Sequence, residues 1–267
     1  MFDEAFSVAA VADALGNLAC RFDVDVLAEC DSTNARLLTL AESGAPSGRV
    51  IAALHQTAGR GRRGRNWFSA PGDSLTFSLL WRLPPDAPLS GLSLAVGVAL
   101  ACALEDLGIA GVSLKWPNDL LLHGRKLAGV LIELVPGASP PAAVIGIGMN
   151  LRRPQGMPED LCRTAAALIE ADLEADIPLP ATVELLARLL TALHEALITF
   201  AVSGFPAFRE AWQKRHAFND CAVQLLGDIS EPLAGICRGV DFDGALLLET
   251  ADGRQRIISG EVSLRPS

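Results

Sequence analysis

One basic, glycine-rich stretch, from His55 to Ser69, constrains this sequence more than any other feature. Residues 59–65 read Gly-Arg-Gly-Arg-Arg-Gly-Arg, with no acidic residue nearby, in a chain whose formal net charge is -9. Glycine lets the backbone approach a ligand closely, and the forked guanidinium of arginine matches the oxygens of phosphates and carboxylates. The composition is therefore typical of a loop that binds an anion.

The flanks of this stretch bear on whether it is a ligand-binding loop. Arginine- and glycine-rich segments are often solvated, or follow a nucleic-acid backbone by charge alone, so a non-enzymatic nucleic-acid-binding module is an alternative. Residues 49–54, however, are apolar enough for a buried strand, and residues 74–81 predict a second strand. A charged loop held between two core strands is placed as ligand-binding loops are.

Length and composition indicate one large globular domain with a small appended one. The chain has 267 residues, 50% of them hydrophobic, which is enough to bury a substantial core. The most apolar run, residues 92–104, is shorter than the roughly 20 residues of a membrane span, and the acidic start is unlike a signal peptide. The acidic balance argues against a general nucleic-acid role. We therefore expect a cytoplasmic protein with neither DNA nor a membrane as partner.

The first part of the chain alternates strand and helix signals. Residues 22–27 predict a strand, and Asp31 or Ser32 is a natural N-cap for a helix over residues 35–43. Ser32 and Thr33 either only cap this helix, or hold a polar or anionic ligand together with its free N–H groups. Further helices are expected over residues 92–107, 159–171 and 181–202.

Residues 112–135 form the second informative region. Their pattern predicts a strand, a bend marked by Pro117, a second strand, a tight turn and a long apolar strand. Lys126 stands at the start of that last strand, where a buried lysine normally has an anionic partner. The partner is either a carboxylate of the chain, such as Asp119 or Glu133, or a bound ligand.

The rest of the chain completes the predicted architecture. Residues 142–151 predict another strand, whose glycines suggest close backbone approach to some neighbouring group. The sequence pattern then changes to short strand-forming segments separated by turns, which suggests a small SH3-like barrel. These strands are expected over residues 222–226, 233–240, 245–249 and 254–258. The predicted fold class is α+β, a central mixed sheet with helices followed by this barrel, with domains over residues 1–218 and 219–267.

Six segments resemble, in the same order, the motifs of biotin protein ligases. They are residues 31–34, 56–65 with Trp67, 115–119, 125–129, 146–150 and 260–265. The resemblance covers nearly the whole chain, so it is highly specific. Members that also act as repressors carry a winged helix before the first strand. Here that strand begins near Phe22, so the chain resembles the monofunctional kind.

The resemblance implies a catalytic domain like that of class II synthetases and an ATP- and Mg²⁺-dependent ligation. Biotin would be activated as biotinyl-5'-AMP and then joined to a lysine of a biotin carboxyl carrier protein, for which the carrier of acetyl-CoA carboxylase is the family expectation. Lipoate and octanoate protein ligases share the fold and are the alternative, although they would be expected to lack the Gly-Arg-Gly-Arg-Arg-Gly run. Monomer and homodimer both stay open.

The resemblance also implies roles for individual residues. Lys126 and Arg62 would be catalytic, because charge must be stabilised where two anions meet, and Asp119 would help to orient Mg²⁺. The expected biotin-binding residues are Ser32, Thr33, Asn34, Gln56, Arg60, Arg62, Lys126 and Gly129. The expected ATP- and adenylate-binding residues are Arg62, Arg63, Arg65, Trp67, Asn118, Asn150 and Arg265. The loop between residues 59 and 68 would close over the adenylate in a disorder-to-order change.

Overall fold

A seven-stranded mixed sheet lies at the centre of the computed structural model, which describes the chain except residues 1–5, 154–156, 172–179, 227–232, 259–262 and 267. The strand order is β1-β2-β3-β7-β6-β5-β4. The strands are β1 (Asp23–Cys30), β2 (Arg49–Gln56), β3 (Ser74–Arg82), β4 (Val112–Lys115), β5 (Asp119–Leu122), β6 (Arg125–Leu134) and β7 (Ala142–Asn150). β1 and β2 pair in parallel, whereas the other neighbouring strands pair antiparallel.

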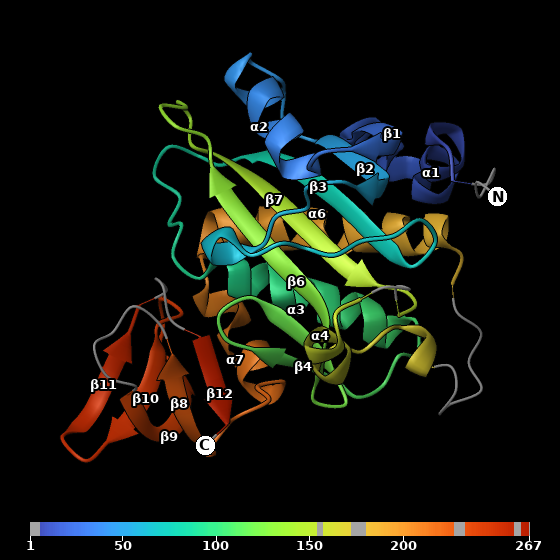
Figure 1. The fold of residues 1–267 in the computed structure, drawn as a ribbon. Helices are drawn as coiled ribbons and strands as arrows, with labels where there is room; N and C mark the ends of the chain where they lie inside the picture. The colour runs from blue at the N-terminus through green and yellow to red at the C-terminus, as the bar shows by residue number, and fades with distance from the viewer. Residues whose placement is uncertain (1–5, 154–156, 172–179, 227–232, 259–262, 267) are drawn as a thin grey trace.

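Helices cover the two faces of this sheet unequally (Figure 1). The helices α1 (Val8–Leu15), α3 (Leu92–Asp106) and α6 (Thr182–Ser203) pack together behind the sheet, whereas α2 (Thr33–Glu42) packs on β2, β3 and β7. Strand alternation separates the two layers, because Val50 and Ala52 join the large core cluster and Ile51 joins the smaller cluster under α2. The part of this second face that α2 leaves uncovered is where a ligand can bind.

The helix α6 combines unusual length with high hydropathy. Within the described part of the chain it alone is long and apolar enough to cross a membrane, with a mean hydropathy of 1.6. Its Leu185, Leu189 and Leu193 are, however, fully buried in the large core cluster, where the helix packs on α3 and α1. Core helices of globular proteins share this composition, because their buried faces need apolar side chains.

One predicted helix is interrupted in the structure. The other helices and strands of the central domain are confirmed to within a few residues, but within the helix expected over residues 159–171 only α4 (Glu159–Thr164) and residues 169–171 are helical, and residues 165–168 are not. Ala165 is extended, with φ -91° and ψ 142°. The cause is a tertiary partner, because the Ala166 N–H donates to the Lys126 carbonyl at 2.8 Å. We call residues 165–171 the strap. Ala165 and Ala166 bond the start of β6, and the Leu168 N–H donates to the Asn150 carbonyl at the end of β7.

After α7 (Pro206–Lys214) the chain forms a second, five-stranded antiparallel sheet of order β11-β10-β9-β8-β12. Its strands are β8 (Ala222–Leu226), β9 (Leu233–Val240), β10 (Leu246–Thr250), β11 (Gly253–Ile257) and β12 (Ser263–Pro266). The Trp116 Nε1–H donates to the Gly244 carbonyl at 3.1 Å, which joins this sheet to the β4–β5 bend. The predicted α+β class with a small appended β domain is confirmed, while the exact domain boundary stays a prediction.

A buried histidine lies at the junction of the two sheets. His216 is 8% exposed, its ring centroid lies 4.5 Å from that of Trp212, and its Nε2 lies 3.8 Å from Cys237 Sγ. Burial lowers the pKa of His216 from 6.5 to about 4, and the carboxylate of Asp220 opposes the shift only partly. The ring is therefore neutral in the folded protein at neutral pH.

This neutral ring should make the protein less stable in mild acid. The unfolded chain binds the His216 proton near pH 6.5, whereas the folded chain does so only near pH 4, so the free energy of unfolding falls across this window. We expect His216 to account for a loss of about 2 kcal/mol between about pH 7.5 and about pH 5. Urea unfolding of the wild type and of His216→Phe, which keeps a ring against Trp212, should show the shallower pH dependence in the variant. Equal dependence in both proteins would contradict this account.

Candidate active site

A cavity of about 680 Å³ occupies the sheet face that α2 leaves uncovered. Its walls come from the N-terminus of α2, the basic loop between β2 and β3, the β4–β5 bend, β6, β7 and α4. The predicted site residues that line it are Ser32, Thr33, Asn34, Gln56, Arg60, Arg62, Arg63, Arg65, Trp67, Asn118, Asp119, Lys126, Gly129 and Asn150. Arg265 lies on β12 opposite Gln224, and its side chain falls outside what the structure describes. Folding thus gathers residues from distant motifs into one site.

The neutral end of the cavity is a network of hydrogen bonds at the start of α2. Of the two predicted N-caps it is Ser32 that caps the helix, accepting from the Ala35 N–H at 3.4 Å. The Thr33 N–H donates to Gln56 Oε1 at 2.8 Å, so this helix-terminal N–H is already occupied. Gln56 also accepts from Thr33 Oγ1 at 3.2 Å. These bonds fix the orientation of the side chains that face the cavity.

Ser78 on β3 extends this network, although the sequence did not single it out. Its fully buried Oγ lies 2.7 Å from Thr33 Oγ1 and 2.5 Å from Asn34 Oδ1. The only signal in the sequence is strand alternation, which places Ser78 on the face opposite Phe77 and Leu79. Nothing local distinguishes such a serine from a solvent-facing one, because its partners are more than forty residues away in sequence.

Asn34 connects the neutral network to the basic loop through Glu133. Asn34 Nδ2 donates to Glu133 Oε2 at 2.9 Å, and Arg60 donates to Glu133 Oε1 at 2.8 Å. Glu133 therefore pairs with the loop and not with Lys126, which was one of the alternatives that the sequence left open. The approach of Asn34 to β7 requires glycine, because a Cβ on Gly146 would lie 2.1 Å from Asn34 Oδ1.

The other end of the cavity, at the start of β6, is cationic. Lys126 Nζ lies 2.7 Å from Asp119 Oδ1, in an ion pair that lacks the alignment of a hydrogen bond. Arg62 donates from NH1 to Asn118 Oδ1 at 3.2 Å. Burial lowers the pKa of Arg62, and the nearby Asp119 carboxylate opposes the shift. Because an arginine stays protonated even so, Arg62 and Lys126 are partly desolvated cations at this end of the cavity.

Trp67 lies over β7 beside these cations. A Cβ on Gly148 would lie 2.4 Å from Trp67 Cε2, so a side chain there would displace the indole. Lys126 Nζ lies 5.7 Å from the ring centroid, within the range of a cation–π contact. The indole Nε1 is buried and finds no hydrogen-bond partner among the residues that the structure describes. Buried donors are seldom left unpaired, so this N–H is suited to a ligand.

The basic loop is folded as a tight hairpin over the cavity. Arg60 and Asn66 form an antiparallel bridge, and the Trp67 N–H donates to the Gly59 carbonyl at 2.8 Å. The tip needs a left-handed turn, with φ 62° at Arg63 and 68° at Gly64. Figure 1 shows the loop crossing in front of β6 and β7. The expected disorder-to-order change stays a prediction.

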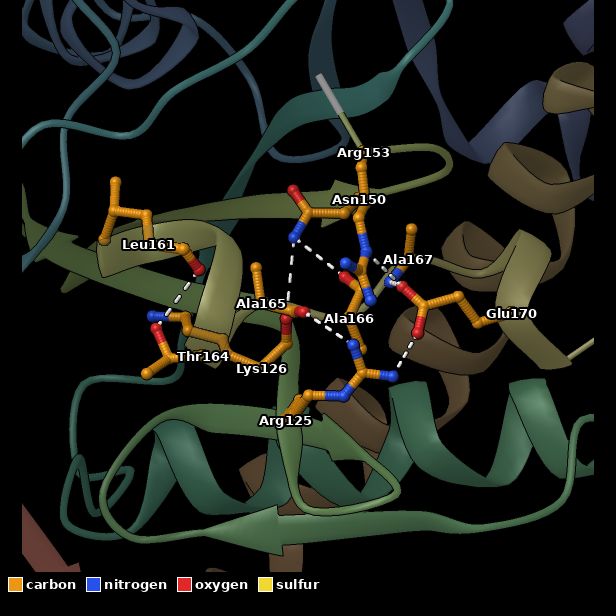
Figure 2. A network of polar contacts seen from close by, with 10 residues as sticks. All are labelled: Arg125, Lys126, Asn150, Arg153, Leu161, Thr164, Ala165, Ala166, Ala167 and Glu170. Carbon is orange, nitrogen blue, oxygen red and sulfur yellow. Dashed lines mark hydrogen bonds and ion pairs between the residues drawn. The ribbon is translucent and has the colours of Figure 1, made fainter. Parts of the chain in front are cut away.

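The strap is joined to the start of β6 and the end of β7 by a network of polar contacts (Figure 2). Asn150 is predicted to bind the nucleotide. Its Nδ2 donates to the Ala166 carbonyl at 3.0 Å, so its amide nitrogen is already bonded to the strap. Arg125 donates to the Ala165 carbonyl at 3.2 Å and pairs with Glu170. The sequence did not reveal the pairing of Arg125 with Glu170, because the two residues are 45 positions apart in the chain. The rim residues that sequence reasoning missed are Met157, Leu161, Arg163, Thr164 and Phe218.

The cavity contains one carboxylate that suits magnesium. In the described ranges no three His, Cys, Asp or Glu side chains lie close enough together to hold a metal ion. Asp119 stands beside Asn118 on the cavity wall. Magnesium at nucleotide sites is often held by one or two carboxylates, with phosphate oxygens and water completing its shell. Asp119 therefore fits a site that is completed by a bound nucleotide.

Known proteins share both halves of this architecture. The biotin/lipoate A/B protein ligase family model matches residues 26–150, and the biotin protein ligase C-terminal domain model matches residues 222–265. The bifunctional ligase/repressor BirA of Salmonella typhimurium is 40% identical over 248 residues, which are 91% of this chain and 74% of that protein. The biotin--[acetyl-CoA-carboxylase] ligase of Mycobacterium tuberculosis is 34% identical over 88% of this chain and 86% of that protein.

A solved structure has a similar fold over most of the chain. The biotin protein ligase from Aquifex aeolicus in complex with biotin and ATP has a TM-score of 0.80 and 33% sequence identity, over 92% of this chain and 99% of that chain. Fold and cavity together thus define a ligase domain of the biotin and lipoate class. The chain belongs to the biotin/lipoate A/B protein ligase family, and within it to the biotin protein ligases.

Proposed function

We propose that this protein is an ATP-dependent biotin protein ligase, which makes biotinyl-5'-AMP and transfers biotin to a lysine of a biotin carboxyl carrier protein. The observation that carries the proposal is the polarity of the cavity along β6. Neutral hydrogen-bonding groups stand near Glu133, and the cations Lys126 and Arg62 stand at the opposite end of the strand. Biotin has a matching order of a polar urea ring, an apolar tail and a carboxylate.

The similar proteins support this substrate. The Mycobacterium tuberculosis relative is named a biotin--[acetyl-CoA-carboxylase] ligase, and the Aquifex aeolicus structure contains biotin and ATP. The family model over residues 26–150 covers lipoate ligases as well, so it does not choose between the two acids. The biotin protein ligase C-terminal domain matched over residues 222–265 favours biotin.

The first step joins two anions. One carboxylate oxygen of biotin forms a bond to the α-phosphorus of ATP, and the bond from that phosphorus to the bridging oxygen breaks, which releases pyrophosphate. Lys126 and Arg62 would stabilise the charge on the carboxylate and the α-phosphate, because cations in a partly desolvated site act strongly. Asp119 holds the Lys126 ammonium at 2.7 Å before the substrates arrive.

The second step consumes the mixed anhydride. The unprotonated ε-amine of the carrier lysine attacks the acyl carbon of biotinyl-5'-AMP, AMP leaves with the bonding electrons, and the amine loses a proton to water. The hairpin over the cavity would keep water from the anhydride until the carrier arrives. The basic side chains of that hairpin would retain the AMP phosphate meanwhile.

The cavity residues divide into two subsites in this proposal. Ser32, Thr33 and Gln56 would bind the ureido ring, while Asn34 and Arg60, tied together by Glu133, would frame that subsite. Gly129 would leave room for the acyl chain, since a Cβ there would lie 3.2 Å from Lys126 Nζ. The nucleotide subsite would comprise Arg62, Arg63, Arg65, Trp67, Asn118, Asn150 and Arg265.

Magnesium, the carrier and the surroundings of the protein complete the proposal. Asp119 would supply one oxygen ligand to Mg²⁺, which would neutralise phosphate charge when bound with ATP. The carrier would be the biotin carboxyl carrier protein of acetyl-CoA carboxylase, in line with the name of the Mycobacterium tuberculosis relative. We propose a cytoplasmic location, and a second domain beginning near residue 219.

ATP–pyrophosphate exchange with the purified protein and Mg²⁺ tests the first step. Biotin, lipoate, octanoate and no acid are compared in parallel reactions, and we expect exchange to depend on biotin alone. Only a site that binds both the acid and ATP can return label from pyrophosphate to ATP. Exchange with lipoate or octanoate in place of biotin would show that the protein is a lipoate or octanoate ligase. The absence of exchange with any acid would refute the proposal that the protein is an adenylating enzyme.

A further inference from the structure

Glu170 is a largely buried carboxylate to which the reaction steps above give no role. Its side chain is 15% exposed, its Oε1 accepts from Arg153 Nε at 2.8 Å and from the Ala167 N–H at 3.0 Å, and its Oε2 pairs with Arg125 (Figure 2). Burial acts to raise the pKa of Glu170, but the hydrogen bonds from Arg153, Arg125 and the Ala167 N–H outweigh it, and the pKa is lowered. A carboxylate with this many donors is a fixed anchor point.

The anchor fastens the strap to the first residues of β6. Arg125 donates from NH1 to the Ala165 carbonyl at 3.2 Å, and the Ala166 N–H donates to the Lys126 carbonyl at 2.8 Å. Lys126 and Ala165 form a parallel bridge. The side chain of Glu170 is absent from the cavity lining, so its connection to the site runs through these backbone bonds.

The backbone of Lys126 is paired with the strap on one side and with β5 on the other. Pairing of β6 with β7 begins only at Ala128, so at Lys126 the strap takes the place of β7. On the other side the ladder with β5 shifts register, since Leu121 pairs with Lys126 but Leu120 pairs with Ala128. Such bulges re-aim side chains and loosen the ladder locally. The backbone at Lys126 is therefore held by the strap on one side and by an irregular ladder on the other.

We propose that Glu170 is a positioning residue for the adenylation step, acting through Lys126. By holding the strap against Arg125 and Arg153, it fixes the backbone from which the Lys126 ammonium reaches Asp119 and the cavity. The inference rests on the proposed function, because Lys126 takes part in chemistry only if the protein adenylates an acid. Misplacing a reacting group by about 1 Å can cost on the order of a hundredfold in rate.

The test measures biotin-dependent ATP–pyrophosphate exchange in Glu170→Gln, which keeps the side-chain volume but removes the charge. We expect kcat to fall by on the order of tenfold to a hundredfold, while the KM for biotin stays close to the wild-type value. Glu170→Asp keeps the charge and should recover part of the rate. The matched control is Glu210→Gln, which removes an exposed carboxylate paired with Lys214 on α7 and should leave kcat unchanged.

A double-mutant cycle separates positioning from a general structural effect. If Glu170 acts through Lys126, then Glu170→Gln should add little further loss in the Lys126→Met background, whereas independent effects multiply. Equal losses in both backgrounds would overturn the proposal, and so would a wild-type kcat in Glu170→Gln. Should Glu170→Gln fail to fold, Arg153→Gln offers a second test. It removes the ion pair that the half-exposed Arg153 side chain makes with Glu170, and it should give a smaller loss of kcat. A wild type without exchange would refute the proposed function itself, so the two failures are distinguishable.

Discussion

Replacing Lys126 by methionine is expected to lower kcat/KM for biotin-dependent ATP–pyrophosphate exchange by on the order of 10²- to 10³-fold, as loss of one preorganised charge-stabilising donor does elsewhere. Methionine keeps the length of the side chain but carries no charge. Asp119, whose Oδ1 lies 2.7 Å from the ammonium, would lose its cation and repel the incoming anions. The carboxylate and the α-phosphate would then meet without the Lys126 charge, although Arg62 still lines the cavity.

Lys214→Met is the matched control for this experiment. Lys214 is 71% exposed and pairs with Glu210 one turn earlier on α7, away from the cavity lining. Exposed pairs of this kind contribute little to stability, so the control should keep both the wild-type exchange rate and the wild-type melting temperature. If Lys126→Met were as active as Lys214→Met, the catalytic role of Lys126 would be wrong.

Arg62→Gly is expected to release the adenylate and to biotinylate lysines indiscriminately. The Arg62 side chain lines the cavity, lies in the tight hairpin and donates to Asn118 at 3.2 Å. Loss of a charge-assisted hydrogen bond to the AMP phosphate, worth about 1.5–3 kcal/mol, would raise the dissociation rate of the adenylate by roughly tenfold to a hundredfold. Free biotinyl-5'-AMP acylates any accessible amine. The variant would therefore lose its selectivity for the carrier lysine more severely than its rate of biotin activation.

The measurement combines the dissociation rate of biotinyl-5'-AMP with mass spectrometry of an unrelated acceptor protein mixed with the carrier domain. Arg254→Gly, which removes an exposed arginine from β11, is the control and should label the carrier alone. Labelling confined to the carrier in Arg62→Gly as well would show that the hairpin does not retain the intermediate.

The strands around the basic loop could be predicted because their signals are local. Apolar runs on both sides of residues 59–65 predict buried strands, and β2 and β3 lie at those places. The ion pairs between distant residues could not be predicted in this way. Lys126 had two candidate carboxylates in sequence, and the pairing of β5 with β6 brought Asp119 to its ammonium while Glu133 met Arg60. Distances along the chain could not decide between them.

The strap shows where local signals mislead. Residues 165–167 are three alanines, the best helix formers, and they follow a helix. Ala165 is extended all the same, and Ala166 and Ala167 lie outside the helix, because the Ala166 N–H donates to the Lys126 carbonyl at the open edge of β6. A propensity of a few tenths of a kcal/mol per residue yields to a buried hydrogen bond, which is worth about 1 kcal/mol.

The amino-acid sequence alone predicts that glycines and cations share one loop between core strands, and that Asp31 or Ser32 caps a helix nearby. Those features depend on spacing and residue type within a few positions. Other contacts appear only in the folded protein, where Asp119 pairs with Lys126, Ser78 and Glu133 complete the polar network, and Glu170 joins the strap to β6. Each of these contacts joins separate elements, so its geometry exists only once the sheet has its register.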